Sequence, residues 1–461
     1  MWRAIPPWMK KQLPIVRKQS AVPGLEAVVD ESDLSSIPVL MGRLQTLLKA
    51  STAKLSSPLS AGEIQTSFLT LLRLSAQMKV QDPYERDMVY EDSGTLLTAD
   101  ERAQFTDIEE TFELADIAYN ELPFDQELRD VLGARNYSLV RHEPLSLPGS
   151  AAHFVALSNE QKVIVIGVKG TSNFEDFLTD ACGNVVNHTL SAPFINGGPV
   201  EIRCHEGVFV AASRLFNDLE RLVEALFIPT GYKITVTGHS LGAGVASLLA
   251  ILLRSRFADL RAESRLKVIA IAPPPILDLD ASLACQPFTT TLVNNADIIP
   301  RTSLSNLIIT MEFLKLVNNK LDESGLKPAG LNTTAAFLKT FMEGINGTMI
   351  MSPQEIKNGW KTSIELVGLD DPDHLFVPGR VLHMYDLWSK PGYGLTHNSS
   401  FPEPADGLLL DSIIHPAERV LVTDGTSPVL RTIEMDGRML SDHMAPAYRS
   451  SIRTLFGAKS D

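Results

Sequence analysis

The chain has 461 residues and a formal net charge of −14, with 44% hydrophobic and 21% charged residues. This composition allows a substantial buried core, and it excludes an intrinsically disordered chain. The acidic balance argues against a nucleic-acid partner.

The first twenty residues contain five basic and no acidic side chains, together with Trp2 and Trp8. Prolines and lysines interrupt the apolar core that a secretory signal would need. No apolar run is long enough to suggest a transmembrane helix. We therefore expect an intracellular protein, cytoplasmic or peripherally bound to a membrane. Residues 1–20 are interpreted as a flexible tail or targeting peptide, with binding to a lipid surface as the alternative.

Residues 21–106 contain helix-like segments without a motif and are interpreted as a helical N-terminal addition. The main domain is expected to begin with a helix at 107–122. The apolar sequence VIVIGV at 163–168 is typical of a central parallel strand. Helical spacing of apolar residues at 207–227 predicts a helix that covers the sheet.

The sequence TVTGHSLGAGVASLLA contains a candidate nucleophile. A β-branched run precedes it and an apolar helical pattern follows it, so Gly238, Ser240 and Gly242 lie on a strand-to-helix turn. This is the G-x-S-x-G spacing of a nucleophile elbow, in which the glycines allow strand and helix to pack closely. His239 belongs to the elbow and is interpreted as structural.

After the elbow, strands are expected at 267–272 and 289–295. Residues 310–370 show little strand character and are interpreted as a helical insertion. A strand is expected at 380–388, and a hairpin at 418–437 around an Asp-Gly turn. The alternation of strands and helices predicts an α/β fold with a mostly parallel sheet.

A serine nucleophile needs a base to accept its proton and an acid to orient that base, and in this fold they follow in the order Ser, Asp, His. Asp297 is the preferred acid because it directly follows the strand at 289–295. Asp278 and Asp280, which follow the preceding strand, are the alternatives.

Five histidines follow Asp297 in the chain: His374, His383, His397, His415 and His443. His443 is the preferred base because it lies between the expected hairpin and a final helix, where a loop can deliver it to the sheet edge. His374 is the main alternative, although its acidic neighbours suit a solvated loop. His383 is expected to be packed within a strand.

The tetrahedral intermediate of acyl transfer needs backbone N–H donors. Leu241 follows the nucleophile and is the first candidate. Thr171 is the second candidate because it comes directly after the strand at 163–168, with Gly170 allowing a close approach.

Taken together, KGTSNFEDFLTD, CHEGVFVAA, VTGHSLGAGVASLLA, VNNADIIPR and LSDHMAPAYRSSI resemble the class 3 lipase family of α/β-hydrolases. The resemblance assigns residues 107–461 to such a domain. It implies a Ser240, His443 and Asp297 triad, Thr171 and Leu241 as oxyanion donors, and a lid at about 184–203. The late insertion and PGRVLHMYDLW look closest to the diacylglycerol lipase branch.

Lys169 stands where the family usually has arginine, which matters little if only the neighbouring amide acts. Cys182 and Cys204 flank the lid, and a bridge between them would fit an oxidising compartment. Without a signal sequence, free buried thiols are expected instead.

The implied function is a lipase that hydrolyses ester bonds of di- or triacylglycerol through an acyl-enzyme, without a metal or cofactor. Its substrate would be a lipid ester, met at a membrane or lipid-droplet surface. One alternative is a soluble carboxylesterase or polyester hydrolase acting on shorter esters. Another is a lipase-like scaffold that binds a partner without catalysis.

Overall fold

The computed structural model describes most of the chain from residue 59 to residue 457. The described stretches are 59–81, 83–119, 125–146, 149–170, 184–262, 264–327, 350–366, 374–387, 416–436 and 438–457. The N-terminal segment 1–20 lies outside them. So do four residues considered above, namely Thr171, Cys182, His397 and His415.

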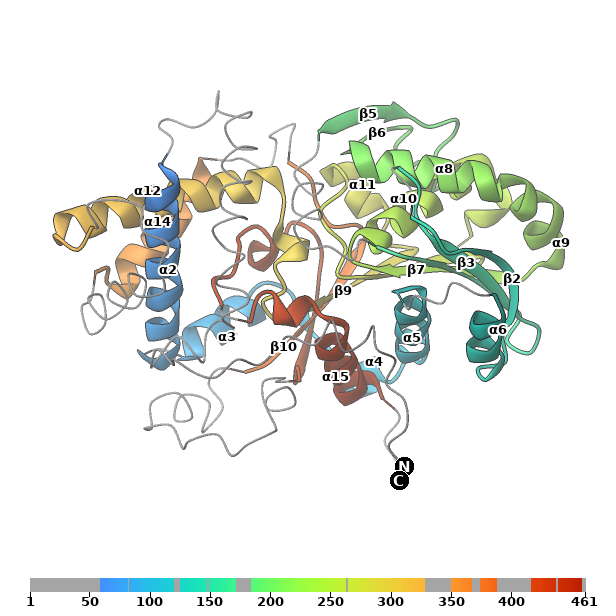
Figure 1. Ribbon diagram of the computed structural model, residues 1–461, viewed down its shortest axis with the longest axis horizontal. Coiled ribbons are helices and arrows are strands. Elements are labelled where there is room, and N and C mark those ends of the chain that lie inside the picture. Colours follow the sequence, from blue (N-terminus) through green and yellow to red (C-terminus); the bar gives the residue numbers. More distant parts are fainter. Residues whose placement is uncertain are drawn as a thin grey trace.

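A nine-stranded sheet in the order β1-β11-β10-β9-β8-β7-β4-β3-β2 forms the centre of the main domain (Figure 1). Its strands are β1 (Thr95–Leu96), β2 (Ser138–Glu143), β3 (His153–Ser158), β4 (Val163–Val168), β7 (Lys233–His239), β8 (Leu266–Ile271), β9 (Thr289–Asn294), β10 (Arg380–Tyr385) and β11 (Arg419–Thr423). The five strands from β4 to β10 in this order are mutually parallel, and the pairs at both edges are antiparallel.

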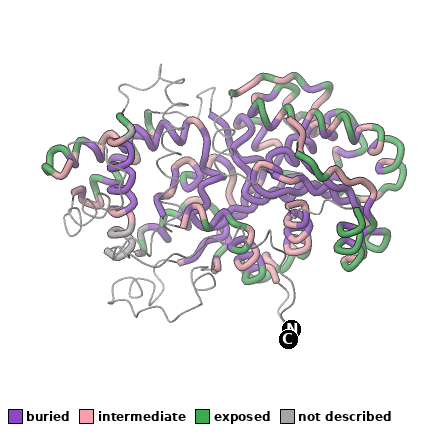
Figure 2. Tube along the Cα trace, viewed as in Figure 1, coloured by how far each residue is buried: buried purple, intermediate pink, exposed green. Residues whose placement is uncertain are grey.

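The parallel strands form because their apolar sequences can be buried on both faces of the sheet. Helices supply that cover, and Figure 2 shows the central strands as mainly buried. The strands expected at 163–168 and 289–295 coincide with β4 and β9. The predicted α/β-hydrolase fold with a mostly parallel sheet is confirmed.

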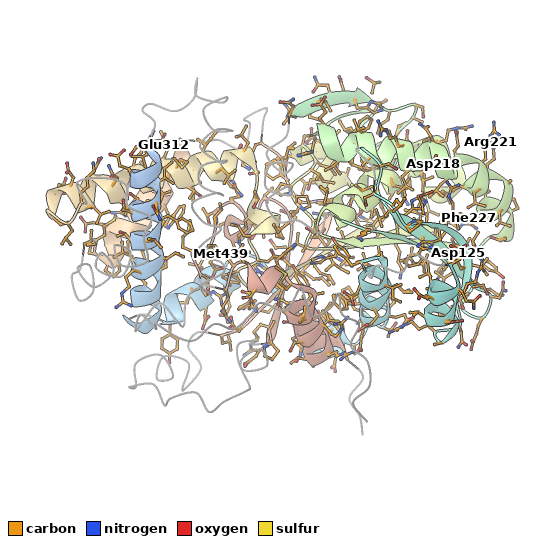
Figure 3. The ribbon with its side chains drawn as sticks, viewed as in Figure 1. Asp125, Asp218, Arg221, Phe227, Glu312 and Met439 are labelled. Atoms are coloured by element: carbon orange, nitrogen blue, oxygen red, sulfur yellow. The ribbon has the colours of Figure 1, made fainter. Side chains whose placement is uncertain are left out.

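Helices cover both faces of the sheet. One face is packed by α8 (Glu206–Leu222) and α10 (Leu241–Arg256), and the other by α5 (Ile108–Tyr119) and α15 (Ala445–Phe456). The helix expected at 207–227 corresponds to α8, which continues as a π-helical turn to Phe227; this side chain, labelled in Figure 3, is fully buried. Shorter helices are α4 (Ala99–Arg102), α6 (Asp125–Gly133), α9 (Ile228–Thr230) and α11 (Leu279–Ala284).

A separate layer of helices lies beside the sheet (Figure 1). It contains α2 (Ala61–Gln81), α12 (Leu304–Glu323) and α14 (Pro353–Glu365), and α3 (Pro83–Glu91) leads from α2 towards the sheet. Helix α12 packs against both α2 and α14, so the N-terminal helical region and the late insertion share one apolar core. Met439, labelled in Figure 3, belongs to this core and precedes the candidate base in sequence.

The prediction of a hairpin at 418–437 is wrong. Only its first half is a strand, β11, and residues Pro428–Leu430 form a turn of 3₁₀ helix. Strand β11 instead pairs with β10 on one side and with β1 on the other. Both edges of β11 are therefore occupied by segments distant in sequence, a tertiary arrangement that a local turn signal cannot reveal.

The segment 184–203, predicted as a lid, contains β5 (Val185–Thr189) and most of β6 (Glu201–His205), which pair in an antiparallel hairpin. The loop between the strands is anchored, because Phe194 is fully buried and its carbonyl accepts a hydrogen bond from Arg254 Nε at 3.0 Å. Ser255 Oγ donates to the carbonyl of Ala192. A lid function for this segment stays a prediction.

We expect Arg254→Met to lower the free energy of unfolding by about 3 kcal/mol, because buried carbonyls would lose a charged donor. The affected carbonyls belong to Phe194, Leu260 and Arg261. Urea unfolding followed by circular dichroism measures the change. The matched control is Arg256→Met on the same helix, where the exposed pair with Glu220 should contribute at most about 1 kcal/mol. Equal effects of the two variants would contradict the anchoring role of Arg254.

Candidate active site

The turn between β7 and α10 has the geometry of a nucleophile elbow. Ser240 adopts φ 58° and ψ −130°, a strained conformation for a residue with a side chain. A Cβ on Gly238 would lie 2.6 Å from the carbonyl carbon of Gly242, and one on Gly242 would lie 2.4 Å from the oxygen of Val168. Both elbow positions therefore require glycine, which explains the G-x-S-x-G spacing.

Three side chains from distant parts of the chain form a continuous hydrogen-bonded series. His443 Nε2 lies 3.0 Å from Ser240 Oγ. His443 Nδ1 lies 3.1 Å from both carboxylate oxygens of Asp297. The carboxylate accepts the Nδ1–H proton, which leaves Nε2 as an acceptor for the serine hydroxyl.

Asp297 is fully buried, and several donors compensate for the loss of water around its charge. Burial alone would raise the pKa of this carboxyl, but the charge and hydrogen bond of His443 lower it below its usual value. The Tyr448 hydroxyl donates to Oδ2 at 2.8 Å, and the Ile299 amide donates to Oδ1 at 2.9 Å. Asp297 therefore remains ionised and faces the imidazole.

His239 contacts both the ring and the backbone of the candidate base, His443. Its ring stacks on His443 with centroids 4.5 Å apart, and its Nε2 lies 2.9 Å from the His443 carbonyl oxygen. Burial and the neighbouring His443 lower the pKa of His239 to about 3, so its ring is neutral and Nε2–H donates. This arrangement agrees with the structural role expected for His239.

The alternative acids have other environments. Asp278 is the N-cap of α11, where its carboxylate accepts from the Ala281 amide at 2.9 Å and also from the Arg203 amide. Asp280 is exposed in the first turn of the same helix. Neither geometry resembles that of Asp297.

The alternative bases are buried elsewhere. His383 lies in β10, as expected, with Nε2 2.9 Å from the carbonyl oxygen of Asn295. His374 is itself buried against the ring of Phe376, with centroids 4.4 Å apart, and its acidic neighbours lie outside the described residues. Among the described histidines, the structure brings His443 to Ser240.

The amide of Leu241 is at the first position of α10, where a helix offers no internal partner for an N–H group. Thr171 lies outside the described residues. The chain leading to it passes close to the elbow, since a Cβ on Gly170 would lie 2.7 Å from the His239 carbonyl oxygen and 3.0 Å from the Gly242 nitrogen. The segment that carries the second predicted donor thus starts beside the first.

The surroundings of the site are apolar and largely closed. Ser240 is 3% exposed and His443 is 6% exposed. Leu241 and Leu440 pack against the core shared by α2 and α12, which includes Ile298. Met444, next to the candidate base, is an exposed apolar side chain. Both catalytic candidates are therefore buried within mainly apolar surroundings.

Two supporting residues were missed by sequence reasoning. Tyr448, which bonds Asp297, follows the candidate base by five positions in the motif LSDHMAPAYRSSI. Its place in the first turn of the helix that follows His443 was the available signal. Arg301, four residues after Asp297, is fully buried and donates to the Asp297 carbonyl.

Comparison with known proteins relates part of the chain to lipases. Residues 165–307 match the family described as lipase (class 3). The chain is 34% identical over 162 residues to diacylglycerol lipase-beta of Mus musculus, covering 33% of this chain and 22% of that protein. It is 32% identical over 163 residues to diacylglycerol lipase-alpha of Homo sapiens, covering 33% and 15%. The chain thus spans less than a quarter of the length of these relatives.

Similarity to solved structures is weaker. A lipase from Yarrowia lipolytica matches 46% of this chain and 78% of its own, with 20% identity and a TM-score of 0.38. The Rhizomucor miehei lipase propeptide complex matches 45% and 64%, with 22% identity and a TM-score of 0.36.

The buried His383 gives a testable pH dependence of stability. Burial, with the charge of Arg301, lowers the pKa of His383 to about 3 from its ordinary 6.5. Between these values the unfolded chain binds a proton that the folded chain does not, so stability falls on acidification. We expect His383→Gln, which can still donate to Asn295, to reduce this slope by about 1.4 kcal/mol per pH unit. Urea unfolding measured from about pH 4 to pH 6 checks this, and an unchanged slope would contradict it.

Proposed function

Because residues 165–307 belong to the class 3 lipase family, we propose that this chain is a serine hydrolase that cleaves ester bonds of glycerolipids. The observation that carries the proposal is the hydrogen-bonded series from Ser240 through His443 to Asp297. The diacylglycerol lipases named above favour a glycerolipid substrate.

The proposed reaction has two stages. Ser240 Oγ attacks the ester carbonyl carbon while His443 Nε2 accepts the hydroxyl proton, and Asp297 stabilises the resulting imidazolium. The tetrahedral intermediate collapses, the C–O bond to the glycerol part breaks, and His443 returns the proton to the leaving alcohol. Water then attacks the acyl-enzyme with the same help and releases a fatty acid.

The negative oxygen of each intermediate needs donors that are already in place. We assign this role to the amides of Leu241 and Thr171. Support for Leu241 is its position at the start of α10, directly after the nucleophile. Support for Thr171 is its place immediately after Gly170, which packs against the elbow.

An apolar ester suits the surroundings of the site better than a polar one. The apolar core shared by α2 and α12 reaches Leu241 next to the nucleophile, and Met444 exposes an apolar surface beside His443. The covered Ser240 fits an enzyme that opens at a lipid surface, and the hairpin at 184–203 is our proposed lid. In the described part of the chain, no helix combines the length and apolarity needed to cross a membrane.

We expect Ser240→Ala and His443→Ala each to lower kcat by roughly 10⁴-fold or more, because members of a triad act as a unit. Hydrolysis of a fluorescent ester measures the rates. Covalent labelling by a fluorophosphonate probe should occur in the unaltered chain and be absent in Ser240→Ala. His374→Ala serves as a control with near-normal kcat. A chain that neither labels nor hydrolyses esters would instead be a non-catalytic lipase-like scaffold.

We also expect faster turnover of long-chain diacylglycerol than of short soluble esters, and a rate increase when a single ester passes its aggregation concentration. The physical reason is that a lipid surface compensates for exposing apolar groups when the site opens. A panel of mono-, di- and triacylglycerols, phospholipids and short esters, with Ser240→Ala as background, measures both effects. Preference for short esters without a response to aggregation would favour a soluble carboxylesterase.

A further inference from the structure

The turn that presents Asp297 is held by a buried guanidinium. Arg301 donates Nη2–H to the carbonyl of Asn295 at 3.0 Å and Nη1–H to the carbonyl of Asp297 itself. Asn295 has φ 43°, in the left-handed region, so the turn is tightly bent where it leaves β9. Arg301 therefore fixes both ends of the bend that aims the Asp297 carboxylate at His443.

Arg301 is itself held by groups that precede and follow it at long range in the sequence. Its Nη2 donates to the hydroxyl of Tyr90 at 3.1 Å and lies 3.3 Å from a carboxylate oxygen of Glu434. Its Nε donates to the carbonyl of Val429 at 2.9 Å. A buried guanidinium needs such a counter-charge, because an unpaired charge in the interior is strongly destabilising.

Helix α3 completes this arrangement. Tyr90 donates its hydroxyl proton to Glu434, which is 344 residues away in sequence. Arg86, one turn earlier on α3, donates Nε–H to the same carboxylate at 2.9 Å and Nη1–H to the Asp386 carbonyl at 2.6 Å. Figure 1 shows α3 beside β10, and the Tyr90 ring packs 4.9 Å from that of His383.

The charges are consistent with a permanent ionic link. Although burial raises the pKa of Glu434, the guanidinium groups of Arg86 and Arg301 lower it below its usual value, so the carboxylate is ionised. Burial and the nearby Glu434 raise the pKa of Tyr90, so its hydroxyl keeps the proton that it donates. One carboxylate thus joins two guanidinium groups and a phenol.

We propose that Arg86, Tyr90 and Glu434 are positioning residues for the active site, acting through Arg301 on the turn that carries Asp297. This inference rests on the proposed function. It makes α3, which lies outside the stretch matched by the lipase family, part of the machinery for ester hydrolysis. The N-terminal helices would then contribute to the rate of the chemical step as well as to stability.

The test compares two tyrosines that pack against each other. Tyr90→Phe removes the hydroxyl that bonds Glu434 and Arg301 and keeps the ring. Tyr385→Phe is the matched control, because its ring lies 4.8 Å from that of Tyr90, while its buried hydroxyl has no hydrogen-bond partner among the described residues. Both variants are made in the full chain, and their melting temperatures are measured first.

For Tyr90→Phe we expect kcat on a soluble ester to fall by about 10-fold or more with KM nearly unchanged, since small misplacements of catalytic groups are costly. The acid limb of its pH–rate profile should move to lower pH, because a less well-held carboxylate stabilises the protonated imidazole less. Tyr385→Phe should keep both the rate and the profile. A Tyr90→Phe variant that matches Tyr385→Phe in kcat and in profile would overturn the proposal.

Proton NMR separates this inference from the proposed function. The His443 Nδ1–H proton that Asp297 accepts should give a far-downfield resonance in the unaltered chain whether or not esters are hydrolysed. Its loss or broadening in Tyr90→Phe, but not in Tyr385→Phe, supports the positioning role. Its persistence in Tyr90→Phe, or its absence from the unaltered chain, overturns it.

If Tyr90→Phe melts near the assay temperature, Arg86→Lys decides by the same criteria. Lysine keeps the positive charge but cannot reach Glu434 and the Asp386 carbonyl with the fixed fork of a guanidinium. We expect a fall in kcat together with an altered downfield resonance. A normal rate and a normal resonance in Arg86→Lys would overturn the proposal.

Discussion

The carboxylate of Asp297 is fully buried, and a buried charge is tolerated only where hydrogen bonds and an opposite charge replace its water. That constraint shapes the candidate site at the carboxyl ends of β7 and β9. Tyr448 and the Ile299 amide each donate to one of the two oxygens, and His443 Nδ1–H donates to the same carboxylate. The base then has one orientation, with Nε2 aimed at Ser240, so the stability of the carboxylate and the geometry of the candidate site have the same origin.

Several parts of this arrangement were predictable because they follow from local rules. The spacing of Gly238, Ser240 and Gly242 is required by close backbone approach, so the elbow was visible in the sequence. Strand β4 has an apolar sequence because both of its faces are covered, and its predicted bounds coincide with those in the structure. Asp297 was found because parallel strands place their carboxyl ends at one edge.

Other parts depend on contacts between distant segments and left no local signal. The Asp424–Gly425 turn predicted a hairpin, but β1 and β10 occupy the edges of β11. His383 in β10 was expected to be packed. The nearby network of Arg86, Arg301 and Glu434 was not foreseen. Arg86 and Glu434 look like ordinary surface charges in sequence, and only folding brings them within 2.9 Å. The lid at 184–203 and the Thr171 amide remain predictions.

The placement of β1 and α3 also bears on how the protein is made. Thr95 pairs with Val422, and Tyr90 bonds a carboxylate 344 positions later, so β1 and α3 find these partners only after residues 422 and 434 have been added. Contacts of such long range slow folding and expose unpaired edges in the meantime. A chain emerging from the ribosome would also lack the proposed catalytic base until His443 had been added. The ester hydrolysis proposed above therefore cannot begin on a nascent chain that has not yet reached residue 443.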